Sequence, residues 1–155
     1  MTSWSNRNTW PASDMAFLRT WFLRPPDLAG LKLGEAGELW AGFLYRKNGF
    51  KIISRNYALF GTKKLGEIDI VCARGRRLVF VEVKTRADEN YMKVVEAVDF
   101  RKQSYLRRMA KLFLQANPQY QDYEFQIDVA AILMDPFDNT VKSVKIIENA
   151  VEDSQ

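Results

Sequence analysis

Charged residues interrupt two apolar stretches of the sequence at short, regular spacing. Glu67 and Asp69 are separated by one isoleucine, and Glu82 and Lys84 by one valine. Side chains alternate across a strand, so each pair is expected to share one face, with Ile68 and Ile70 on the opposite face. Carboxylate oxygens are the ligands that Mg²⁺ and Mn²⁺ prefer, and a neighbouring lysine could orient or deprotonate an attacking water. The pattern predicts a divalent-metal site that hydrolyses phosphodiesters.

A simpler interpretation of the second pair is an ion pair within a strand. Opposite charges often pair in sheets, so Glu82 and Lys84 alone would favour that interpretation. The presence of Glu67 and Asp69 upstream favours a metal site instead. Burying this many charges without compensation would cost several kcal/mol per ion. A bound cation would supply the compensation.

Composition narrows the chemistry further. The chain of 155 residues has no histidine and one cysteine, Cys72. Serine–histidine triads, histidine-dependent nucleases and histidine zinc sites are therefore excluded, and no internal disulfide can form. The sequence has neither a membrane-spanning apolar run nor the order of a signal peptide, so we expect a soluble cytoplasmic protein.

Hydrophobic periodicity predicts the elements that must position these charges. A helix is expected over 34–48, strands over 50–57, 67–73 and 78–85, a helix through 105–113 that ends before Pro118, and strands over 123–134 and 141–147. A basic turn is expected over 60–66. The order is α-β-β-β-α-β-β, an α/β fold.

Three regions are expected along the chain. Residues 1–30 form an N-terminal extension, either an accessory helix or a partly disordered arm. Residues 31–147 form one domain, and residues 148–155 form an acidic tail.

Basic residues gather in three places although the net charge is only +4. Four lie in 51–64, three in the turn at 74–77 and five in 101–111, without an acid in any of these stretches. Such clusters suit a polyanionic partner, although a basic run is more often a solvated face.

The same residues resemble the YraN-like proteins, which are predicted endonucleases of the PD-(D/E)XK superfamily related to archaeal Holliday-junction resolvases. The resemblance covers about residues 31–147. It is carried by Gly34-x-x-Gly37-Glu38-x-x-Ala41, Arg55-Asn56, Gly66-Glu67-Ile68-Asp69-Ile70-Val71, Leu78-Val79-Phe80-Val81-Glu82-Val83-Lys84-Thr85-Arg86, Lys102-Gln103 and Phe125-x-Ile-Asp128-Val-Ala. It implies a restriction-endonuclease-like three-layer sandwich around a central mixed sheet.

The resemblance also implies roles for individual residues. The metal (Mg²⁺ or Mn²⁺) would be held by Asp69, Glu82, the Val83 carbonyl and Glu38. Lys84 would be the catalytic lysine, and Glu67 could contact water beside the metal. Asp128 would be structural, anchoring the second helix.

Residues expected to contact nucleic acid surround this site. They are Lys63, Lys64, Arg76, Arg77, Arg86, Lys102, Gln103 and Arg107. By analogy the substrate would be branched or single-stranded regions of DNA, met during recombination or repair, and the enzyme a homodimer. A non-catalytic nucleic-acid-binding module with the same fold is the alternative.

Overall fold

The computed structural model describes residues 22–88 and 100–151 and contains two α-helices and one five-stranded sheet in that part of the chain. The elements, in chain order, are α2 (Leu33–Lys47), β1 (Lys51–Phe60), β2 (Lys64–Arg74), β3 (Arg77–Arg86), α4 (Phe100–Ala116), a short 3₁₀ helix (Pro118–Tyr120), β4 (Glu124–Met134) and β5 (Val141–Ile147). Within residues 22–88 and 100–151, the predicted order of helices and strands is confirmed.

The sheet is mixed, and its spatial order β1-β2-β3-β4-β5 follows the chain. Neighbouring strands are antiparallel except β3 and β4, which are parallel. Parallel neighbours need a crossover connection, and α4 lies within it. The elements therefore build a mixed α/β fold.

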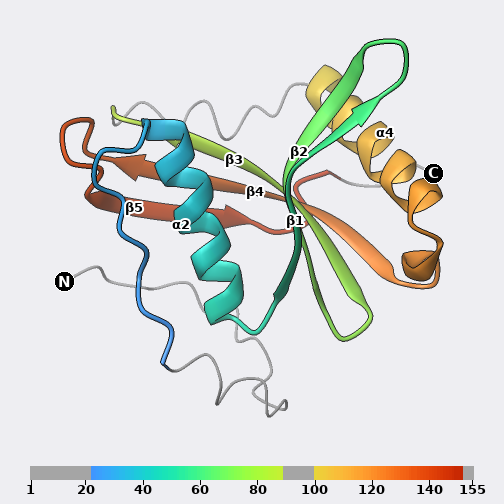
Figure 1. The fold of residues 1–155 in the computed structure, drawn as a ribbon, viewed down its shortest axis with the longest axis horizontal. Coiled ribbons are helices and arrows are strands. Elements are labelled where there is room, and N and C mark those ends of the chain that lie inside the picture. The colour runs from blue at the N-terminus through green and yellow to red at the C-terminus, as the bar shows by residue number, and fades with distance from the viewer. Residues whose placement is uncertain (1–21, 89–99, 152–155) are drawn as a thin grey trace.

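Each helix covers a different face of the sheet (Figure 1). The core under α2 contains Tyr45 of the helix together with Val79 and Val81 of β3. The core under α4 contains Phe113 of the helix together with Phe80 of the same strand. The alternation along β3 thus buries both of its faces, as its nearly continuous apolar sequence predicts.

The hairpin of β1 and β2 is longer than the sequence predicts. The expected turn over 60–66 is confined to residues 61–63, because β1 continues to Phe60 and β2 begins at Lys64. The pairing of β2 with β3 ends at Ile70, whereas its pairing with β1 continues to the turn. Residues 57–69 therefore extend beyond β3 as a two-stranded ribbon, here called the hairpin arm (Figure 1).

The segment before α2 is held by a side chain from the β4–β5 turn. The buried Asn139 donates from Nδ2 to the carbonyl oxygens of Leu28 and Leu31, both at 2.9 Å. Residues 22–32 form no helix. The predicted accessory helix otherwise lies outside the described residues.

Asp128 is a buried structural residue, but it anchors the first helix rather than the second. Its carboxylate accepts hydrogen bonds from the Tyr45 hydroxyl (2.6 Å), Gln126 Nε2 (2.8 Å) and the backbone N–H of Asn149 (3.0 Å). Beyond β5, Val151 is buried in the core under α4. The first residues of the expected acidic tail therefore pack against the domain.

None of the helices in the described part of the chain is long and apolar enough to cross a membrane.

Candidate functional site

Asp69 lies where β2 separates from β3. The β2–β3 ladder ends at the pair Ile70 and Val81, so the next stretch of β3 lacks a backbone partner from β2. The backbone N–H of Val83 instead donates to Asp69 Oδ2 at 2.7 Å. The Asp69 carboxylate thus accepts the hydrogen bond that a backbone carbonyl of β2 would otherwise accept. The Val83 carbonyl, which the resemblance implies as a metal ligand, belongs to the residue that donates this bond.

The strand alternation fails at this point. Ile68 packs in the core under α4, while Ile70 packs in the core under α2. The prediction that these two isoleucines share a face is therefore wrong. The break in the alternation coincides with the end of the β2–β3 ladder at Ile70.

The electrostatics of Asp69 are unfavourable for a carboxylate. Burial, and then the negative charge of Glu82, raise the pKa of Asp69 from 3.8 to about 6, against the lowering effect of the Val83 N–H. The charge of Glu38 raises this pKa further and that of Lys84 lowers it. Glu82, Glu38 and Lys84 are therefore all close enough to Asp69 to shift its pKa.

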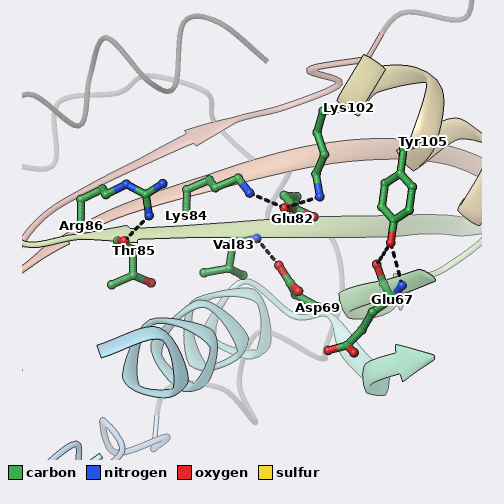
Figure 2. Close-up of polar contacts among 9 residues, drawn as sticks. All are labelled: Glu67, Asp69, Glu82, Val83, Lys84, Thr85, Arg86, Lys102 and Tyr105. Carbon is green, nitrogen blue, oxygen red and sulfur yellow. Dashed lines mark hydrogen bonds and ion pairs between the residues drawn. The ribbon is translucent and has the colours of Figure 1, made fainter. Parts of the chain in front are cut away.

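Glu82 is only 6% exposed and is paired with two lysines. Its Oε1 atom accepts from Lys84 Nζ at 2.6 Å and from Lys102 Nζ at 2.9 Å. Figure 2 shows both lysines reaching Glu82 from one side of β3, while Asp69 reaches the strand from the other. Lys102, expected to bind phosphate, thus lies within the site, 4.7 Å from the centre of the Tyr105 ring.

Glu38 approaches from α2, which packs closely on β3. A Cβ added at Gly37 would lie 1.8 Å from Thr85 Oγ1, so only glycine allows this approach. The pKa of Glu38 is raised above its usual value, mainly by burial. A hydrogen bond from the Asn56 side chain opposes this shift. Asn56 has φ of 48°, a left-handed conformation that asparagine tolerates better than most residues.

Asn56 is a site residue that the sequence reasoning missed. The family resemblance includes Asn56 but implies no role for its side chain. An asparagine inside a strand, where it is normally depleted, was the available signal.

Glu67 is held in place by Tyr105 of α4. The Tyr105 hydroxyl accepts from the Glu67 N–H at 2.8 Å and donates to the Glu67 carbonyl at 3.2 Å (Figure 2). Gly66 makes room for this contact, because a Cβ there would lie 2.5 Å from both the Tyr105 hydroxyl and Met109 Sδ. The Glu67 carboxylate forms an ion pair with Lys64.

The acids do not form a complete metal cage. Within the described ranges, no three histidine, cysteine, aspartate or glutamate side chains are grouped closely enough to hold a metal ion by themselves. Asp69, Glu82 and Glu38 instead form an incomplete set of hard oxygen donors.

The predicted nucleic-acid contacts fall into two separate groups. Lys63, Lys64, Arg86, Lys102, Gln103 and Arg107 lie on the hairpin arm, the end of β3 and α4. Arg76 and Arg77 lie at the opposite end of β3, about 16 Å from Glu82 by strand rise. There Arg76 donates to the Asp122 carbonyl at 3.0 Å, so the turn arginines are not part of the site.

Comparison with known proteins identifies the family. A family model described as "Uncharacterised protein family UPF0102" matches residues 37–132. The chain belongs to the UPF0102 family. The match confirms the YraN-like resemblance at the level of the family.

The matched region spans nearly the whole of each relative and about three quarters of this chain. A UPF0102 protein of Alkaliphilus metalliredigens is 38% identical over 118 residues, which are 76% of this chain and 96% of the relative. UPF0102 proteins of Moorella thermoacetica and Caldanaerobacter subterraneus are 37% and 34% identical, over 76% of this chain and 92% and 93% of their own lengths. The region matched by the family model contains Glu38, Glu67, Asp69, Glu82 and Lys84.

Proposed function

We propose that the protein is a Mg²⁺- or Mn²⁺-dependent endonuclease that hydrolyses DNA phosphodiester bonds. The observation that carries the proposal is the pair of carboxylates, Asp69 and Glu82, at the point where β2 leaves β3. Burial, and then the negative charge of Glu82, raise the pKa of Asp69, so the site favours an added positive charge.

The donor set fits a divalent cation of this kind. Mg²⁺ is typically bound by one or two carboxylates, with waters and substrate phosphate completing its coordination. The hydrogen bonds described above use Oδ2 of Asp69 and Oε1 of Glu82, so each carboxylate has a second oxygen to offer. When bound, the cation would polarise a phosphate oxygen and stabilise charge on the departing oxygen.

The chain's own residues would supply the remaining chemistry. Lys84, which forms an ion pair with Glu82, would orient the attacking water and stabilise charge that builds on phosphorus. Two further acids would position water at the margin of the site. They are Glu38, which is hydrogen-bonded to Asn56, and Glu67, whose backbone is hydrogen-bonded to Tyr105. Lys102 adds a second ammonium group where a phosphate would lie.

The superfamily, the restriction-endonuclease-like layout and the substrate belong to the same proposal. The spacing of Asp69, Glu82 and Lys84 and the helices on both faces of the mixed sheet support the PD-(D/E)XK assignment. Branched or damaged DNA, a role in recombination or repair and a homodimer follow from the resemblance, and a cytoplasmic location is part of the same proposal.

One observation favours a second candidate, a non-catalytic nucleic-acid-binding module. Lys84 and Lys102 both pair with Glu82, so the buried carboxylate is compensated without a cation. This is the strand ion pair that the sequence also allowed.

A cleavage assay separates the two candidates. The protein is incubated with junction, flap, single-stranded and linear duplex DNA in Mg²⁺, Mn²⁺ or EDTA, beside Asp69→Ala and Glu82→Ala. The nuclease proposal expects metal-dependent cleavage that both substitutions abolish. Cleavage of no substrate, or unchanged cleavage by both variants, would refute it. Salt-sensitive binding without cleavage would support the module.

A further inference from the structure

The hairpin arm ends in exposed apolar side chains. Phe60 is 70% exposed and Leu65 is 39% exposed, although both lie at the end of a strand pair. Phe60 pairs with Lys64 in the ladder, so both residues are next to the turn. Large exposed apolar groups at a projecting tip are typical of an interaction surface.

The charge around this tip is positive. Lys63 and Lys64 are exposed, and residues 51–64 contain no acid. Phe137 provides a contrast, because it is 96% exposed but lies in the β4–β5 turn between Asp135 and Asp138. The chain thus presents one phenylalanine among lysines and another among aspartates, and only the first suits a polyanion.

The arm is braced from α4. An isolated two-stranded hairpin is at best marginally stable in water. In this arm, however, Gly66 packs against Tyr105 and Met109. The Tyr105 hydroxyl also forms hydrogen bonds with both the N–H and the carbonyl of Glu67. Phe60 is therefore presented on a supported element whose base is the Asp69–Glu82 site.

We propose that the hairpin arm binds nucleic acid at an unpaired base, with the Phe60 ring stacked on that base and Lys63 on the adjacent phosphate. Stacking of bases on aromatic side chains within a positive surface is a general way of binding unpaired nucleotides, and it tolerates any base. The arm would thereby select DNA that contains a bulge, flap or branch.

The geometry also gives a cleavage position, and this part rests on the proposed nuclease function. Asp69 follows Lys64 by five residues, or roughly 17 Å along β2 at the rise of a strand. That length corresponds to about five stacked nucleotides at 3.4 Å each. Cleavage is therefore expected about five nucleotides from the stacked base.

Binding is measured in EDTA, so that cleavage plays no part. The probe is a duplex with a single bulged 5-iodouridine, compared with the same duplex without the bulge. Phe60→Ala should weaken binding of the bulged duplex about 10- to 100-fold, with little effect on the linear duplex. Phe137→Ala should change neither, and irradiation of the parent complex should crosslink the iodouridine to Phe60.

Parent-like binding of the bulged duplex by Phe60→Ala would overturn the proposal, as would equal losses in both phenylalanine variants. A Phe60→Ala variant that loses only self-association would overturn it in favour of a second copy of the chain. If the protein binds the bulged duplex through Phe60 but cuts no DNA in Mg²⁺, the proposed nuclease function is wrong and the binding by the hairpin arm stands. Failure of the arm alone appears as Asp69-dependent cleavage that Phe60→Ala leaves unchanged.

Discussion

Replacing Asp69 with asparagine should stabilise the metal-free protein at neutral pH. Asparagine retains an acceptor for the Val83 N–H but carries no charge. The pKa of Asp69 is raised from 3.8 to about 6, so its ionisation disfavours the folded state by about 3 kcal/mol. For a chain of this size the gain corresponds to about 6–12 °C in Tm.

The pH dependence of this gain has a definite sign. A carboxyl with a raised pKa binds its proton more tightly when folded, so its favourable contribution is complete below about pH 4 and is lost as pH rises through 6. Parent and Asp69→Asn should be equally stable near pH 4. Above pH 6 the variant should be more stable.

Urea denaturation in EDTA between pH 4 and 8 measures the difference. Asp122→Asn, at an exposed position, is the matched control and should track the parent. Equal stability of parent and Asp69→Asn at pH 8, or a less stable variant, would refute the electrostatic reasoning. Added Mg²⁺ should stabilise the parent and Asp122→Asn, by about 2.7 kcal/mol at one hundred times its Kd, but not Asp69→Asn.

Three further predictions concern the same framework. Tyr45→Phe removes a 2.6 Å hydrogen bond to the buried Asp128 and should lower the free energy of unfolding by about 1–3 kcal/mol in urea titrations. Gly66→Ala forces a methyl group against Tyr105 and should cost about 1–3 kcal/mol, measured in the same way. Mn²⁺ binding, followed by electron paramagnetic resonance, should be detectable in the parent and lost in Asp69→Asn; equal binding by both would place the cation elsewhere.

Local patterns were sufficient to predict the elements and much of the site. The nearly continuous apolar run from Leu78 to Val81 predicts a strand buried on both faces, and the structure has that strand. The order of helices and strands followed from similar periodicities. These features depend on neighbours in the sequence, which is why sequence alone reveals them.

Contacts between distant segments could not be predicted in this way. The split of β2 from β3 at Asp69 depends on how far each ladder extends, and the sequence of β2 carries no mark of it. The pairing of Lys102 with Glu82 and the bonds of Tyr105 to Glu67 join α4 to strands many residues away. Helical spacing puts Tyr105 in the apolar stripe of the helix through 105–113, so the sequence does not reveal the role of its hydroxyl.

The single-turnover rate of DNA cleavage in Mg²⁺, measured for the parent and for Glu82→Gln on one branched substrate, tests the central claim most directly. Glutamine keeps the shape of Glu82 but removes the charge beside Asp69. We expect cleavage by the parent that requires Mg²⁺ and stops in EDTA, and no detectable cleavage by Glu82→Gln even though it still binds the substrate. Cleavage by Glu82→Gln at the parental rate would contradict the assignment of this site.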